Sequence, residues 1–139
     1  MNRNEFLKQL GFTGSALMAV YCLGGCEYKD IGKATRTVVD FTLDLSLPEN
    51  KTLKTSGGYV IANNVVVAFT TVGTFAAVTL ICSHEGYSEI VYDYARNLFS
   101  CGRHGAEFDT DGKGLNARGV KGLKTYTTFL NGNLLRVAG

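Results

Sequence analysis

The chain has 139 residues, which is enough for one domain but too few for two domains with separate cores. Hydrophobic residues make up 45% of it, and its 17 glycines and single proline are typical of a globular β protein, not of a disordered or helical-repeat chain. A net charge of +2 is too small to indicate nucleic acid or an anionic membrane surface as the main partner.

Residues 1–25 have the pattern of an export signal. Arg3 and Lys8 give a charged head, and the apolar and small residues of 11–25 are too few to span about 30 Å of hydrocarbon as a helix. The end of this run, Leu23-Gly-Gly-Cys26, resembles a bacterial lipobox. That resemblance implies lipidation of Cys26, which becomes the first residue of the mature chain. A plain signal peptide or a short anchor is the alternative.

The charged head carries a second resemblance. Residues 2–8 are similar to the twin-arginine export motif, except that Asn4 stands in place of the second arginine. That route carries folded proteins. Residues 26–36 are polar and of mixed charge, and we expect them to be a tether between the lipid anchor and a domain that covers residues 37–139.

Beyond the tether the sequence predicts β-strands and no helix. From 39 to 46, apolar residues alternate with polar ones, which indicates a half-buried strand. Asn63 and Asn64 tolerate the positive φ of a hairpin turn between two further strands. We expect 49–52 to be a turn and 107–124, which is rich in glycine and charge, to be a loop. The other strands are predicted at 57–62, 65–70, 75–81, 89–92, 97–100, 126–130 and 134–137.

Four metal-binding side chains stand in one window of this domain. Cys82 and His84 form a Cys-x-His pair, and Cys101 and His104 form a Cys-x-x-His pair. These two pairs contain both histidines of the chain. Because Cys22 and Cys26 belong to the leader region, no structural disulfide is expected in the domain.

Thiolates and imidazoles suit zinc or an iron–sulfur cluster, whereas calcium and magnesium prefer oxygen ligands. Two metal sites fit the pairs. One is a closed, structural Cys₂His₂ zinc site, although zinc sites usually pair cysteine with cysteine and histidine with histidine. The other is a cluster of two irons, one held by Cys82 and Cys101 and the other by His84 and His104.

The segments Cys82-Ser-His-Glu-Gly86 and Cys101-Gly-Arg-His-Gly105 resemble the two boxes of the Rieske iron–sulfur family. The resemblance covers residues 37–139 and favours the cluster over zinc. It implies an all-β fold, an antiparallel β-sandwich with a small cluster-binding subdomain of two loops around residues 82–105. It also implies a [2Fe-2S] cluster as cofactor. After the second box the family often has a glycine, a small residue, an aromatic residue and an aspartate, which are matched here by Gly105, Ala106, Phe108 and Asp109. Gly119, Leu123 and Tyr126 match a later segment of the family, with Val120 in place of its proline.

The chain departs from the family at positions beside the cluster. High-potential members have an extra cysteine in each box, joined as a disulfide, and Tyr87 and Arg103 occupy those places. Ala106 and Phe108 stand where a serine and a tyrosine donate hydrogen bonds to the cluster. Since such bonds stabilise the added electron, the resemblance implies a potential in the lower half of the family range of about −150 to +300 mV.

The resemblance implies an electron carrier that exchanges single electrons with a redox partner protein, such as a cytochrome or an oxidoreductase. We expect it to be exported, lipid-anchored through Cys26 and located on the periplasmic side of a bacterial membrane. No small-molecule substrate or nucleic acid is expected, and any catalysis would belong to the partner. The alternatives are a small subunit of a periplasmic oxidase or dehydrogenase, similar to that of arsenite oxidase, and a zinc-stapled structural module.

Overall fold

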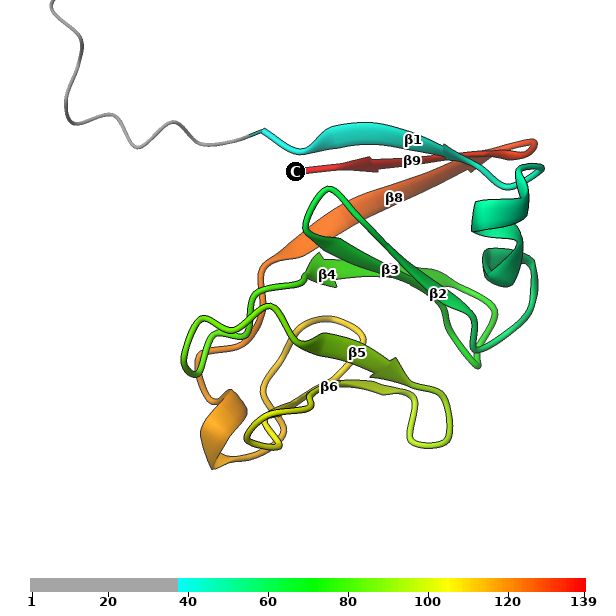
Figure 1. Cartoon of the computed structure of the whole chain (residues 1–139). Helices are drawn as coiled ribbons and strands as arrows, with labels where there is room; N and C mark the ends of the chain where they lie inside the picture. The colour runs from blue at the N-terminus through cyan, green and yellow to red at the C-terminus, as the bar shows by residue number, and fades with distance from the viewer. Residues whose placement is uncertain (1–37) are drawn as a thin grey trace, which may run out of the picture. The chain divides into compact units, whose positions relative to one another are not determined.

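The computed structural model describes residues 38–139 (Figure 1). The predicted signal peptide (1–25), the predicted lipidation site Cys26 and the predicted tether (26–36) lie outside the described residues.

The described part of the chain is built from nine strands and two short 3₁₀ helices. All paired strands are antiparallel, so the predicted all-β class is confirmed. The strands are β1 (Asp40–Asp44), β2 (Tyr59–Ala62), β3 (Val65–Phe69), β4 (Phe75–Thr79), β5 (Ile90–Asp93), β6 (Leu98–Cys101), β7 (Glu107–Phe108), β8 (Thr125–Asn131) and β9 (Leu134–Ala138), and the helices are η1 (Pro48–Lys54) and η2 (Ala117–Gly119).

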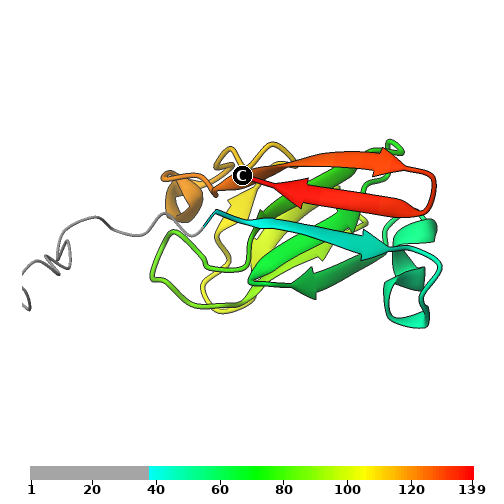
Figure 2. The same cartoon turned by 90° about the horizontal axis from the view of Figure 1, so that it is seen from above.

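The strands form two sheets. The larger has the order β1-β9-β8-β4-β3-β2, and the smaller has the order β5-β6-β7. In Figure 1, β1, β9 and β8 lie together at the top and the small sheet lies at the lower end, beyond β3 and β4. Viewed from above, β1, β9 and β8 run side by side (Figure 2).

Strand β3 separates two hydrophobic cores. Its apolar run is buried on both faces, because alternate side chains of a strand point to opposite sides. Val65 and Val67 pack with Leu135 and Val137 in one core. Val66 and Ala68 pack on the other side, in the core that holds the small sheet and both domain cysteines. The small sheet is therefore fixed to the larger one through β3.

The Asn63-Asn64 turn between β2 and β3 is as predicted. Both asparagines have positive φ, 50° and 60°, which matches the right-handed twist of the paired strands. A third asparagine, Asn97, has a φ of 51° in the turn between β5 and β6. At all three positions the left-handed backbone conformation is adopted by asparagine, which tolerates it better than most residues.

Two predicted irregular segments contain secondary structure, so these predictions were wrong. The predicted turn at 49–52 is part of η1, which begins with Pro48 and buries Leu53. The predicted loop at 107–124 contains β7, paired with β6, and the single turn η2. Strands of two residues and single helical turns are too short to show a hydrophobic period, so tertiary contacts decide them.

No helix within residues 38–139 has the length and hydrophobicity needed to cross a membrane.

Candidate metal centre

Two loops at one edge of the small sheet carry the predicted ligands. The first ligand loop, residues 82–89, leads into β5, and the second, residues 101–106, leads from the last residue of β6 into β7. Each loop closes the same turn on itself, with two backbone hydrogen bonds at matching positions. The bonds run from Cys82 N to Tyr87 O (2.8 Å), Gly86 N to Cys82 O (2.8 Å), Cys101 N to Ala106 O (2.9 Å) and Gly105 N to Cys101 O (3.0 Å).

A glycine with positive φ completes each turn. Gly86 has a φ of 76° and Gly105 a φ of 69°, a region that side chains with a Cβ atom enter at a cost. This requirement explains why both Cys/His pairs are followed by glycine.

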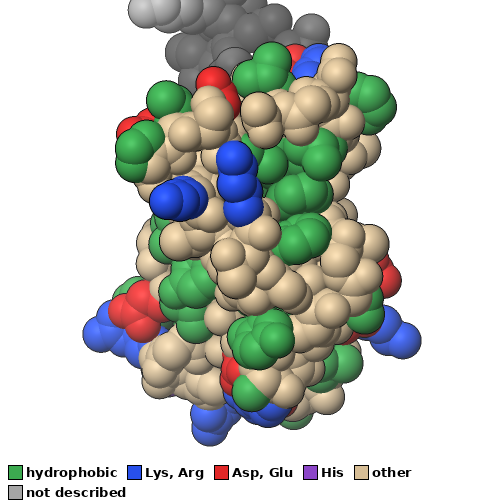
Figure 3. All heavy atoms as spheres, turned by 90° about the vertical axis from the view of Figure 1, so that its right-hand side faces the viewer, with side chains coloured by type: hydrophobic (Ala, Val, Ile, Leu, Met, Phe, Trp, Pro, Cys, Tyr) green, Lys and Arg blue, Asp and Glu red, His purple; other side chains and the backbone are tan. Residues whose placement is uncertain are grey.

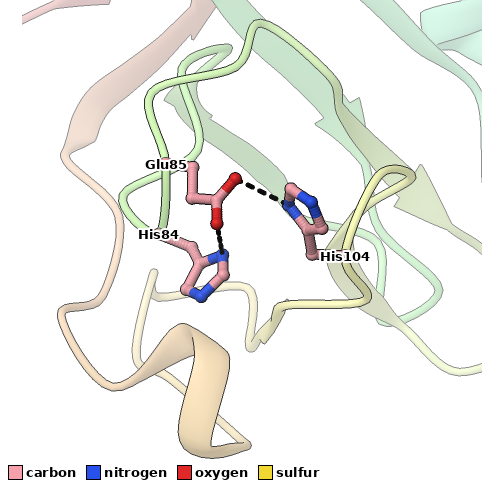
Figure 4. Close-up of side chains that lie close together, drawn as sticks. All are labelled: His84, Glu85 and His104. Carbon is pink, nitrogen blue, oxygen red and sulfur yellow. Dashed lines mark ion pairs between the residues drawn. The ribbon is translucent and has the colours of Figure 1, made fainter.

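The histidines occupy different places in these equivalent turns. His84 is the second residue after its cysteine and His104 is the third, so the rings approach each other from non-equivalent positions. Their centroids are 5.4 Å apart and their planes are inclined by 68°. Glu85 holds the place in the first ligand loop that His104 holds in the second, and its carboxylate lies between the two rings (Figure 4).

Each histidine turns an unpartnered nitrogen inward. The Nδ1 atoms of His84 and His104 are buried and have no hydrogen-bond partner within the described residues, although the side chains are 31% and 33% exposed. Glu85 carboxylate oxygens lie 3.9 Å from His84 Nδ1 and 3.3 Å from His104 Nδ1, without hydrogen-bond geometry. Buried imidazole nitrogens without a hydrogen-bond partner are available to bind a metal. Neither histidine is visible in Figure 3, which shows the right-hand side of the molecule as drawn in Figure 1.

The two cysteines lie on the inner side of the site. Cys82 and Cys101 are free thiols, each 2% exposed. Burial raises the pKa of the Cys82 thiol, while backbone N–H groups of His84 and Glu85 that point at its sulfur lower the pKa. The proximity of the Cys101 thiol also raises the pKa of Cys82. Two adjacent buried thiols of this kind ionise readily only when a cation compensates their charge.

The donor geometry distinguishes the two candidate metals. Nitrogen and oxygen atoms of His84, Glu85 and His104 lie within 4.8 Å of one another, and the cysteine sulfurs do not join this group. In a single tetrahedral zinc site all four donors would lie roughly 3.3 to 3.8 Å apart. Thiols on the inner side and imidazoles on the outer side fit a cluster of two irons instead. Such a cluster supplies one-electron chemistry when bound.

A third segment, missed by the sequence analysis, supports the second ligand loop. Asn116 Nδ2 donates to the Gly105 carbonyl at 2.8 Å, and its Oδ1 accepts from Glu107 N and Gly119 N at 3.3 and 3.0 Å. Arg118 donates to the His104 carbonyl. The preference of asparagine for helix N-caps is a sequence signal for the turn at Asn116. No local signal indicates that it reaches Gly105.

Gly119 is required at this contact, because a Cβ atom there would lie 2.4 Å from the Glu107 carbonyl oxygen. The structure also describes Ala106 and Phe108, the two positions at which the sequence analysis expects no hydrogen-bond donor. Ala106 and Phe108 are fully buried in the core cluster that contains both thiols. Ser83 was also missed, and its buried hydroxyl has no partner among the residues described.

Solved structures show the same fold. The cyanobacterial plasma membrane Rieske protein PetC3 from Synechocystis PCC 6803 is 31% identical, with a TM-score of 0.50, and the match covers 58% of this chain and 84% of that protein. The ferredoxin of carbazole 1,9a-dioxygenase from Nocardioides aromaticivorans IC177 is 21% identical, with a TM-score of 0.54, over 63% of this chain and 91% of the ferredoxin. The Rieske monooxygenase CntA is 14% identical, with a TM-score of 0.54, over 72% of this chain and 32% of that enzyme.

A comparison with curated proteins gives no match. Protein-family profiles match residues 36–127 to the family described as the Rieske [2Fe-2S] domain, and this range contains both ligand loops and the segment that supports the second one. The chain therefore belongs to the Rieske [2Fe-2S] domain family.

Proposed function

We propose that this Rieske electron-transfer protein holds its [2Fe-2S] cluster with Cys82 and Cys101 on one iron and His84 and His104 on the other. The observation that carries the assignment is the pair of buried, unpartnered Nδ1 atoms on neighbouring rings, together with two buried thiols in the same two loops. Because the histidine side chains are partly exposed, a single electron would enter and leave the protein on their side.

Composition and colour of the purified protein test this proposal. We expect two irons and two acid-labile sulfides per chain, with a visible absorption spectrum that bleaches on reduction. A colourless sample that contains one zinc ion would support the zinc-stapled module and refute the electron carrier.

We further propose that the protein is exported and anchored by a lipid at Cys26, on the periplasmic side of a bacterial membrane. The lipobox-like residues 23–26 support this proposal. The Synechocystis relative is described as a plasma membrane protein, which is consistent with a membrane location. A Cys26→Ser variant should lose incorporation of labelled fatty acid and leave the membrane fraction. Equal labelling of the variant and the native chain would contradict the anchor.

The electron partner is a protein of the cytochrome or oxidoreductase class. The partly exposed imidazoles allow a partner to approach the site directly. Affinity purification of the full chain from membranes distinguishes two arrangements. A partner that dissociates with added salt fits a carrier, whereas a large subunit that remains bound would fit a permanent redox subunit.

A further inference from the structure

The two ligand loops have little backbone connection to each other. Beyond the β5–β6 ladder, the described part of the chain has one backbone hydrogen bond between them, from Gly102 N to the Glu89 carbonyl at 3.2 Å. The remaining backbone–backbone hydrogen bonds of the loops close each turn on itself. The separation of the two histidines therefore depends on side chains.

Arg103 of the second ligand loop reaches across to the first. Its Cζ atom lies 4.2 Å from the centre of the Tyr87 ring. Its Nη1 atom lies 3.3 Å from a carboxylate oxygen of Glu89. One guanidinium group is thus held by two residues of the other loop.

Tyr87 also contacts a proposed ligand. The centroid of its ring is 5.9 Å from that of His104, and the planes are inclined by 55°. Tyr87 is fixed within its own loop, because its carbonyl accepts the hydrogen bond of Cys82 N. The Tyr87 ring therefore lies against Arg103 and against His104, which are neighbours in the second ligand loop.

We propose that Tyr87 and Arg103, with Glu89 as the anion that holds Arg103, form a noncovalent bridge that fixes the two ligand loops and orients the His104 ring. These are positioning residues, not ligands. The inference rests on the proposed function, because it takes the two loops to hold the cluster.

The aromatic contact contributes more to this bridge than the ion pair. The side chains of Arg103 and Glu89 are 48% and 44% exposed, and an exposed ion pair of this kind contributes little. Stacking of a planar, weakly hydrated guanidinium on an aromatic ring survives exposure to water better. Loss of either Tyr87 or Arg103 should therefore weaken the bridge to a similar degree.

Cluster loss from the holoprotein in the presence of an iron chelator tests the bridge. We expect Tyr87→Leu and Arg103→Met each to speed cluster loss about two- to fivefold. The effect of the double variant on the rate should be smaller than the product of the two single effects, because both changes remove the contact between Tyr87 and Arg103. The EPR spectrum of the reduced protein, which responds to imidazole orientation, should shift in both single variants.

Two control variants separate the bridge from general destabilisation. The Tyr87 hydroxyl makes no hydrogen bond within residues 38–139, so Tyr87→Phe keeps the ring contact and should retain the native rate and spectrum. Lys124→Met removes a similar contact, with Nζ 4.8 Å from the Tyr126 ring centre, outside the ligand loops. It should leave cluster loss unchanged.

Hydrogen exchange of the full chain as purified gives a readout that needs no cluster. Amides of residues 82–89 and 101–106 should exchange faster in Tyr87→Leu and Arg103→Met, and at the native rate in Tyr87→Phe and Lys124→Met. Unchanged exchange, additive effects in the double variant, or equal effects of Phe and Leu at position 87 would each overturn the bridge. If the unsubstituted protein contains no iron and the variants still show this exchange pattern, the proposed function is refuted and the bridge remains supported.

Discussion

Ala106 and Phe108 belong to the same core cluster as the two thiols, and their side chains donate no hydrogen bond. Both residues are fully buried, in the core cluster that also contains Cys82 and Cys101. A reduced cluster carries one more negative charge than an oxidised one, and donors beside its sulfurs would stabilise that charge. An apolar wall at these positions therefore favours a low reduction potential.

A hydroxyl introduced at position 106 should raise the reduction potential. A hydrogen bond that strengthens by about 1–2 kcal/mol on reduction corresponds to a rise of about 40–90 mV for a one-electron couple. We expect this rise in Ala106→Ser by protein-film voltammetry. Ala77→Ser, at a buried alanine of the other core, should leave the potential unchanged. An unchanged potential in Ala106→Ser would contradict the claim that the missing donor at position 106 lowers the potential.

Glu85 places a carboxylate between the two imidazoles, 3.3 Å from one Nδ1 atom and 3.9 Å from the other. Its negative charge opposes the addition of an electron, so Glu85→Gln should raise the reduction potential by on the order of tens of millivolts. The rise should shrink at high ionic strength, because Glu85 is partly exposed. Glu49→Gln, on η1, provides the charge-matched control. A lower potential in Glu85→Gln would contradict the electrostatic explanation.

The ligand types could be read from the sequence, and their orientation could not. The two Cys/His pairs use both histidines and two of the four cysteines, so few other thiolate or imidazole ligands remain. Which ring nitrogen points inward depends on the turn that follows each cysteine. The contact of Arg103 with Tyr87 also depends on loop geometry, so the sequence indicates only that no disulfide joins these positions.

At the scale of elements, the two ligand loops are the same turn used twice. Matching hydrogen bonds and a glycine of positive φ define both turns, and only the step from cysteine to histidine differs. This offset of one residue directs two rings from similar loops toward each other instead of side by side.

Alanine substitutions test the equivalence of the turns. Neither Gly86 nor Gly105 has an atom close enough to clash with a Cβ, so the cost of alanine is backbone strain alone, about 1–2 kcal/mol of unfolding free energy at each site. Gly102 lies in the same region with open space and without positive φ, and Gly102→Ala should be neutral. Denaturant unfolding measures all three variants. A cost at position 102 equal to the others would refute strain as the cause.

Elements with their own local signal could be predicted, and elements made by distant contacts could not. The β2–β3 hairpin follows from two apolar runs around Asn63 and Asn64. Strand β7 exists because Phe108 and Glu107 pair with β6. The support of Gly105 by Asn116 joins residues eleven positions apart in the chain and leaves no periodic pattern.

At the scale of the whole molecule, β3 is shared between the two cores, so the ligand loops are attached to the larger sheet by packing. Val66 lies in the core that contains both thiols, and Val67 lies in the other core. Both side chains are fully buried. Substitutions at these two adjacent positions can therefore test the stability of the fold and the retention of the cluster separately.

Truncation of these valines should separate the two properties. Val66→Ala and Val67→Ala should each lower the free energy of unfolding by about 2–3 kcal/mol. Only Val66→Ala should also speed cluster loss under native conditions, because it opens space in the core behind the thiols. The check is cluster loss in chelator, measured beside denaturant unfolding. Equal rates of loss in the two variants would show that the cores do not act separately.

The assignment of two imidazoles to one iron is the central claim, and pulsed EPR of the reduced protein tests it most directly. We predict couplings to two nitrogen nuclei from coordinated imidazoles, with one of them missing in a His84→Cys or His104→Cys variant that retains iron. A spectrum without such couplings, or an unchanged spectrum in both variants, would contradict this account.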